Sequence, residues 1–194
     1  MSERSSTATR RAILESTRSL LIELGASQLT IRRVEERSGF KAPTIYHHFR
    51  DKTGLIDSLL EEDCADLYAR LCHVPRRANP LEYLRELARA YLWFGLSNPT
   101  HYALISAPRR ESARPLPSAE AARELVFRAL LAASDSGTLA GRDPEAVFQA
   151  VWAVLHGVVS LAVSRPDHPW RPELVDLALE AIEHGILHKE ASSR

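Results

Sequence analysis

Two short helical patterns on either side of a glycine turn occupy residues 30–52, TIRRVEERSGFKAPTIYHHFRDK, and they constrain the fold more than any other segment. Thr30 stands where a side chain caps the first turn of the first pattern, and Gly39 supplies the left-handed residue that commonly ends a helix. The second pattern holds Pro43 in its opening turn, the one part of a helix that tolerates proline. The segment therefore predicts two helices joined by a tight turn.

The second of these helices has an apolar face and a polar face. Its inward positions are Phe40, Ile45 and Phe49, with His48 expected to pack beside them. The positions left for a partner are Lys41, Ala42, Pro43, Thr44, Tyr46 and His47. A helix that packs on one side and offers basic, hydroxyl and small side chains on the other is typical of the recognition helix of a helix-turn-helix, which enters the major groove of DNA.

A longer amphipathic pattern precedes this pair over residues 9–24 and stops at Gly25. Its inward stripe consists of Ile13, Leu14, Thr17, Leu20, Leu21 and Leu24. We expect this helix to pack under the other two as the third member of a trihelical head. The residues before it, MSERSSTAT, are predicted to be a mobile arm. Either the arm is simply disordered or Arg4 and Arg10 touch a DNA groove.

The residues from 29 to 55 resemble the DNA-binding segment of the tetracycline-repressor (TetR) family of bacterial transcription regulators. The matching positions are Thr30, Arg32, Gly39, Pro43, Thr44, Tyr46, His48, Phe49, Lys52 and Leu55. With the preceding helix, the likeness covers about the first quarter of the chain. It implies a repressor that binds a palindromic operator as a homodimer and is released by a small-molecule effector.

The resemblance also implies roles for individual side chains. Thr44, Tyr46 and Lys52 fall on positions that bind backbone phosphate, with His47 beside them. Lys41, Ala42 and Pro43 would face base edges in the major groove, and Arg32 could reach a guanine from the preceding helix. Many members of the family carry serine and a small or polar residue where this chain has Lys41 and Ala42, so the operator sequence cannot be transferred from a relative.

The composition supports a polyanion partner for the N-terminal part. The net charge of the 194 residues is zero, but residues 1–52 hold ten Lys and Arg against six Asp and Glu, and the rest hold fifteen against nineteen. A basic front on an acidic body indicates one localised phosphate-binding face. No apolar run is expected to span a bilayer, and no secretion signal is expected. Cys64 and Cys72 are too far apart on one predicted helix for a disulfide, so a cytoplasmic location away from membranes is expected.

The remaining chain is predicted to be helical throughout, which makes the protein all-α with about nine helices. Residues 1–51 would form the DNA-binding domain and 52–194 the regulatory domain. Further helices are expected at 51–72, 81–98, 101–107, 118–134, 144–164 and 172–188. The charged, proline-rich stretch 108–117 is expected to be a mobile loop.

The helix over 144–164 is apolar nearly all round, which a single small core cannot use. One face carries Phe148, Trp152, Leu155, Val159 and Ala162 and is expected to point to the core. The other face and the last helix are expected to form a four-helix interface between two subunits through Val147, Val151, Val154, Val158, Leu161, Leu174, Leu177, Ala178, Ala181, Ile182 and Gly185. The alternative is that both helices merely close the core of one subunit.

Around Trp152, His156 and Gly157 the sequence also resembles the family's C-terminal domain type with a Trp-His-Gly motif. Gly157 is expected to relieve crowding at a helix crossing. By the resemblance, an effector binds among the later helices, with candidate lining residues Tyr68, Tyr91, Trp93, Tyr102, Phe127, Phe148, Trp152 and His156. Ordinary core packing is the alternative for each of them.

Two rival classes of function leave little trace in the sequence. No phosphate-binding glycine loop or nucleophile motif indicates an enzyme, and no cofactor is expected. His184 and His188 have metal-ligand spacing but lack a third ligand, so a solvated face is expected instead of a metal site. A helical module that binds protein is the other rival, and the salt dependence of binding would distinguish it from a DNA-binding protein.

Overall fold

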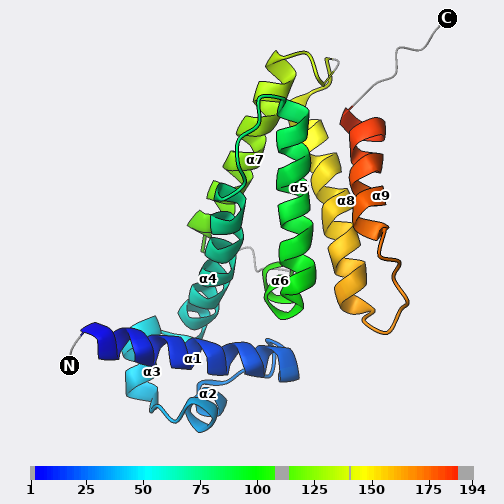
Figure 1. The fold of residues 1–194 in the computed structure, drawn as a ribbon. Coiled ribbons are helices and arrows are strands. Elements are labelled where there is room, and N and C mark those ends of the chain that lie inside the picture. Colours follow the sequence, from blue (N-terminus) through cyan, green and yellow to red (C-terminus); the bar gives the residue numbers. More distant parts are fainter. Residues whose placement is uncertain (1–2, 108–113, 140, 188–194) are drawn as a thin grey trace, which may run out of the picture. The chain divides into compact units, whose positions relative to one another are not determined.

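The computed structural model describes residues 3–107, 114–139 and 141–187. Within those ranges the chain forms nine α-helices and a short π-helical segment, with no strand, which confirms the all-α prediction. The chain divides into two compact units (Figure 1). Unit 1 holds the chain up to Asp63 together with Leu104–Leu116, and unit 2 holds Cys64–Ala103 and the chain from Pro117 onward.

Unit 1 is built on a trihelical core. Helix α1 (Glu3–Leu24) packs against α2 (Ile31–Ser38) and α3 (Ala42–Phe49), and the first part of α4 (Lys52–Cys72) completes the core. The predicted inward stripe of α1 is buried as far as Leu21, and Leu24 is partly buried. The core consists of Ile13, Leu14, Leu20, Leu21, Leu29, Val34, Ile45, Phe49, Leu55 and Leu59.

The N-terminal arm predicted for the first nine residues is wrong from Glu3 onward, because α1 begins there. Serine and threonine are only mildly unfavourable in a helix, so a helix anchored by a buried stripe extends through them at little cost. Arg10 lies on this helix and pairs with Glu62 of α4, so it is engaged within unit 1. The side chain of Arg4 lies outside the described residues.

The helix starts are confirmed where the sequence carries a capping side chain. Thr30, Asp51 and Asp143 each accept a hydrogen bond from the backbone N–H three residues further on, at 3.3, 2.7 and 3.1 Å. Gly39 ends α2 in the left-handed conformation, at φ 76°. These local signals place α2, α4 and α8 within a residue or two of their predicted bounds.

The later helices are α5 (Pro80–Ser97), α6 (Pro99–Ile105), α7 (Pro117–Asp135), α8 (Pro144–Ser164), α9 (Leu174–Ala181) and the π-helical segment Ile182–Leu187. Two differ clearly from expectation: α6 starts and ends two residues early, and α9 starts two residues late and widens into the π-helix. Pro117 opens α7, although it was expected to end the preceding loop, since proline fits the first turn of a helix. Residues 108–113 of that loop and the end of the last predicted helix, including His188, lie outside the described residues.

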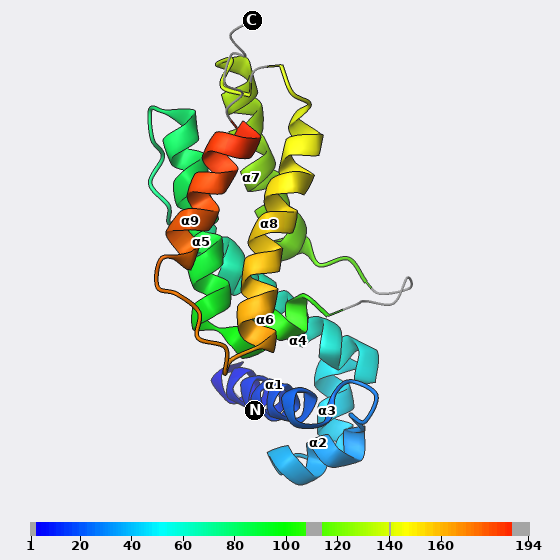
Figure 2. The same cartoon turned by 90° about the vertical axis from the view of Figure 1, so that its right-hand side faces the viewer.

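In unit 2, α5 packs against α7, α8 and α9 (Figure 2). Helices α5 and α8 approach each other closely at Gly95. A Cβ atom on Gly95 would lie only 2.4 Å from Cγ1 of Val159 and 3.0 Å from Cδ2 of Tyr102, so only glycine fits there. The sequence predicts this crossing role for Gly157, but a Cβ on Gly157 would meet no atom of the described residues within 4 Å. That expectation was wrong for contacts inside one copy.

Helix α8 is covered on one side only. Val147, Leu155 and Val159 are buried, whereas Trp152 and Leu161 are 53% and 50% exposed. By length and composition alone α8 could cross a bilayer, with a mean hydropathy of 1.9 over a window that is 17% buried in this chain. The expectation that no apolar run is long enough was therefore wrong. A helix that packs against protein on both faces has the same composition.

We predict that Gly95→Ala destabilises the protein by about 1–3 kcal/mol, because Val159 is stiff at χ1 and has to move with its helix. Thermal denaturation followed by circular dichroism measures this, and adding Val159→Ala should recover part of the loss. Gly157→Ala on α8 is the matched control, since no atom in the described part of its own chain lies within 4 Å of the new methyl group. A Gly95→Ala protein as stable as the wild type would contradict the proposed close approach.

Candidate nucleic-acid interface

The two faces of α3 differ in the way the sequence predicts. Ile45 and Phe49 are 0% and 3% exposed and belong to the core of unit 1. The outward positions are exposed at Lys41, Pro43, Tyr46 and His47 and half-buried at Ala42 and Thr44. The eight residues of α3 therefore present a continuous outer strip about two turns long.

The start of α3 is held by a residue that the sequence analysis did not single out. Lys41, in the N-cap position, makes no capping hydrogen bond with its side chain. In its place, Oε1 of Glu35 on α2 accepts a hydrogen bond from the backbone N–H of Ala42 at 2.7 Å. The lysine at position 41, where a capping residue would be expected, indicated that another side chain caps α3. The neighbouring sequence does not identify that side chain.

The arginines of α2 are each held by a neighbour. Arg37 donates two hydrogen bonds to the carboxylate of Glu23 on α1, at 2.8 and 2.6 Å, and this hydrogen bonding lowers the pKa of Glu23. Arg32 pairs with Glu36 at 3.0 Å on its own helix, and its side chain is 86% exposed. An exposed pair of this kind contributes little and exchanges easily with water or a phosphate. Arg32 is thus available to an outside partner, whereas Arg37 ties α2 to α1.

Lys52 and the two adjacent histidines lie at the end of α3 and the start of α4. The ammonium of Lys52 donates to the backbone carbonyl of Ala26 at 3.2 Å, so it is oriented by the turn after α1. The rings of His47 and His48 meet edge to face with centroids 5.5 Å apart. Burial, followed by His47 and Arg10, holds the pKa of His48 below its ordinary value, so this ring adds no charge to the face at neutral pH.

The turn between α3 and α4 is strained. Arg50 has φ 66° and ψ −55°, a conformation that side-chain-bearing residues rarely adopt. The N–H of Asp51 donates to the carbonyl of Phe49 at 2.8 Å, which closes a tight γ-turn over Arg50. A Cβ on Gly54 would lie 2.2 Å from that same carbonyl oxygen, so α4 can follow the turn only with glycine there.

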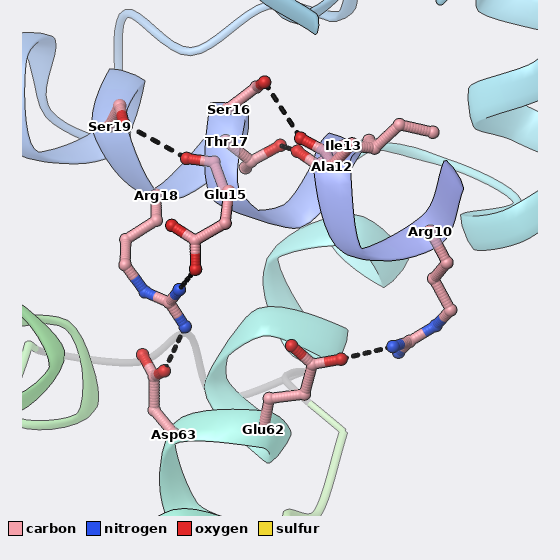
Figure 3. Close-up of polar contacts among 10 residues, drawn as sticks. All are labelled: Arg10, Ala12, Ile13, Glu15, Ser16, Thr17, Arg18, Ser19, Glu62 and Asp63. Atoms are coloured by element: carbon pink, nitrogen blue, oxygen red, sulfur yellow. Dashed lines mark hydrogen bonds and ion pairs between the residues drawn. The ribbon is translucent and has the colours of Figure 1, made fainter. Parts of the chain in front are cut away.

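Two ion pairs tie α1 to α4 inside unit 1 (Figure 3). Arg18, with a side chain 9% exposed, lies between Glu15 of its own helix and the fully buried Asp63 of α4. Arg10 pairs with Glu62. The sequence analysis missed both pairs, although Asp63 interrupts the leucine stripe of α4 and was a signal that a buried partner exists.

In unit 2, four of the residues predicted to line an effector site come together. Tyr102 Oη lies 3.1 Å from Tyr91 Oη and 2.7 Å from Nδ1 of His156, and Nε2 of His156 lies 3.2 Å from Oγ of Ser160. The ring of Trp152 lies beside that of His156, with centroids 5.8 Å apart. Burial is the main cause that raises the pKa of both tyrosines, so their hydroxyls remain protonated at neutral pH. The network joins α5, α6 and α8 through groups that both donate and accept hydrogen bonds.

The other candidate lining residues do not join this network. Phe127 and Phe148 meet edge to face at 6.2 Å, and the guanidinium of Arg123 lies 5.6 and 5.8 Å from their ring centroids. Trp93 is 53% exposed on α5, and Tyr68 lies on α4 with its pKa raised mainly by a hydrogen bond with Cys72. Among the described residues no group of three potential metal ligands is found.

Only part of the predicted subunit interface lies on the surface of one copy. Val147, Ala178 and Ile182 are 3%, 9% and 3% exposed because they pack inside unit 2, so their assignment to the interface is wrong. Leu161 and Leu177 are 50% and 59% exposed. The outward set that remains is Val151, Val154, Val158, Leu161, Leu174, Leu177, Ala181 and Gly185, all exposed or half-buried.

Both parts of the chain match known families. Residues 13–59 match the family model described as bacterial regulatory proteins of the tetR family, and residues 84–184 match the tetracyclin repressor-like C-terminal domain. The HTH-type transcriptional repressor Rv1474c of Mycobacterium tuberculosis is 35% identical over 83 residues, which are 43% of this chain and 42% of that protein. The tetracycline repressor protein class C of Escherichia coli is 40% identical over 52 residues, or 27% and 24% of the two chains.

The chain thus matches less than half the length of these curated relatives. A solved structure from Shewanella sp. PV-4, assigned to the tetR family of transcription regulators, covers 93% of this chain and 99% of its own, with a TM-score of 0.78 and 16% identity. This likeness concerns the fold.

We predict that Arg50→Gly stabilises the protein relative to Arg50→Ala, the reverse of the usual order for these residues. Glycine adopts the positive φ without strain, and the strain at such a residue is of order 1–3 kcal/mol, against roughly 0.5–1 kcal/mol for the added freedom of the unfolded chain. Urea titrations of the two variants measure the difference. Equal midpoints, or a more stable Arg50→Ala protein, would show that the turn is not strained.

Proposed function

The chain belongs to the tetR family of bacterial regulatory proteins, and from that premise we propose that it is a transcriptional repressor. It would bind a palindromic operator as a homodimer and leave it when a small-molecule effector binds. As a regulator of DNA it would act in the cytoplasm. The observation that carries the proposal is α3, a helix that is buried along one side and presents basic, hydroxyl and small side chains along the other.

The first part of α3 would read bases. Lys41, Ala42 and Pro43 lie at the end of the helix that enters the groove in a helix-turn-helix. Lys41 can donate to O6 or N7 of guanine, and Ala42 or Pro43 can contact a thymine methyl group. Arg32 could reach a guanine from α2, because only an exposed pair with Glu36 holds it.

The middle of α3 and the start of α4 would bind phosphates. Tyr46 and Thr44 offer hydroxyl donors, His47 lies beside them, and Lys52 supplies a cation already oriented by Ala26. Such contacts carry little sequence information but supply much of the affinity. The residues at positions 1–51 would therefore form the DNA-binding domain and 52–194 the regulatory domain.

The outer sides of α8 and α9 would pair two copies. The outward set of Val151, Leu161, Leu177 and their neighbours leaves an apolar surface that one copy does not cover. Large exposed apolar patches mark interfaces between proteins. Two-fold pairing would also suit a palindromic operator.

The effector would bind at the hydrogen-bonded network of Tyr91, Tyr102 and His156 in unit 2, beside the ring of Trp152. Polar groups among aromatic side chains are typical of small-molecule sites. In a dimer the two reading helices have to fit grooves about 34–36 Å apart. An effector that favours another spacing would shift the population away from the DNA-bound state, and α4, which contributes to both units, is the segment through which it would act.

We predict that Lys41→Ala relaxes the preference at one base pair of each half-site and costs about 1–3 kcal/mol on the preferred sequence, because a base contact is lost. Lys52→Ala should weaken binding to all duplexes alike and reduce the salt slope by about one. Fluorescence anisotropy with the intergenic DNA beside its own gene, and with a scrambled duplex, measures both. Equal losses on the two duplexes for both variants would contradict this division of roles, and binding that ignores salt would indicate a protein partner instead of DNA.

We also predict that Leu177→Glu converts the dimer to a monomer at micromolar concentration, because a carboxylate would be buried without a partner. Sedimentation velocity measures the oligomeric state, and affinity for the intergenic duplex should fall at least about tenfold, because one reading head is lost. Leu131→Glu on α7 is the matched control, since Leu131 is 40% exposed and lies outside the proposed interface. A Leu177→Glu protein that stays dimeric would place the interface elsewhere.

A further inference from the structure

Glu35 is bonded to both sides of the turn between α2 and α3. Its backbone carbonyl accepts from the N–H of Gly39 at 2.9 Å and so closes the end of α2. Its carboxylate accepts from the N–H of Ala42 at 2.7 Å and so opens α3. The carboxylate thereby supplies an acceptor for one of the first amides of α3, which have no carbonyl partner within their own helix.

This bond completes the first turn of α3. The N–H of Ala42 goes to Glu35, Pro43 has no N–H, and the N–H of Thr44 donates to the carbonyl of Lys41 at 2.9 Å. A helix N-terminus commonly attracts phosphate because its amides point outward and its dipole is positive. Here the amides already have acceptors and a carboxylate offsets the helix dipole, so this end of α3 does not attract a phosphate.

The charged residues around Glu35 do not compete for the hydrogen bond between its carboxylate and α3. The arginines on the same helix have other partners, with Arg32 on Glu36, Arg33 on the carbonyl of Gln28 at 2.6 Å, and Arg37 on Glu23. Glu35 itself is half-buried, which restricts its side chain to few positions. The bond to Ala42 therefore has no arginine of α2 competing for the carboxylate.

From these contacts we propose that Glu35 is a positioning residue for the choice of DNA site. The proposal rests on the proposed function and goes beyond it. Glu35 fixes the first turn of α3 on α2, so that Lys41, Ala42 and Pro43 meet base edges at one angle. Its charge also repels phosphates from that end, which disfavours binding modes in which α3 lies against the backbone. Both effects raise the discrimination between an operator and other DNA more than they raise affinity.

The experiment compares Glu35→Ala and Glu35→Gln with the wild type in the full-length protein. Glutamine at position 35 keeps a hydrogen-bond acceptor but removes the charge, whereas alanine removes both. Glu35→Gln therefore reports the effect of charge alone. The probes are a duplex enriched by the wild-type protein from a random library and a random duplex of equal length.

For Glu35→Ala we expect the ratio of the two affinities to fall about five- to tenfold, the factor for a lost helix cap. For Glu35→Gln the ratio should fall by no more than about threefold, while binding to the random duplex strengthens at low salt. An unchanged ratio in Glu35→Ala would overturn the proposal. So would an equal fall in Glu35→Gln, because the loss of charge alone would then explain it.

A second measurement separates this inference from the proposed function. Amide hydrogen exchange in the free protein should be about five- to tenfold faster at Ala42 in Glu35→Ala than in the wild type or Glu35→Gln, because the acceptor is lost. If the wild type binds no duplex, the proposed function fails, and exchange at Ala42 still decides whether Glu35 positions α3. Unchanged exchange in Glu35→Ala would refute the positioning role whatever the protein binds.

Discussion

The docking of α3 on the core of unit 1 is the constraint on which the rest of the proposed DNA-reading surface depends. A helix of eight residues is too short to persist alone in water, because nucleation costs more than its few hydrogen bonds return. Ile45 and Phe49 supply the burial that holds it, and Glu35 supplies the acceptor at its start. The side chains left in water are the basic and hydroxyl ones. The same packing therefore forms the helix and exposes the face that we propose reads DNA.

The polar contacts of unit 1 set geometry more than they add stability. In a buried ion pair such as Arg18 with Asp63, the attraction between the charges offsets much of the hydration free energy that both lose on burial. Loss of either partner nevertheless leaves an unpaired buried charge. Together with the pair of Arg10 and Glu62, it restricts how α4 can lie on α1. The tight turn at Arg50 and the bare backbone at Gly54 then restrict how α4 follows α3. The start of α4 is thus defined from two sides.

In unit 2 the helical glycines Gly95 and Gly157 have different surroundings. Gly95 allows α5 and α8 to touch within one copy, whereas no described residue of the same copy lies within 4 Å of a Cβ on Gly157. The difference follows from the side of α8 on which each contact lies, since Val159 points inward and the face with Leu161 remains in water. An apolar helix covered on one side only is consistent with pairing of two copies.

Features that depend on residues close together along the chain could be predicted from the sequence. These are the helical class, the caps at Thr30, Asp51 and Asp143, the end of α2 at Gly39 and the outward strip of α3. The family could be predicted as well, and the comparisons confirm it. The tertiary structure alone decided which apolar face of α8 is inward, since a helix that is apolar all round has no preferred side, and it buried Val147 while exposing Trp152. It also paired Arg18 with Asp63, 45 residues away, and brought Glu35 to the start of α3. Such contacts depend on how the helices pack against one another, which the spacing of residues along the chain does not determine.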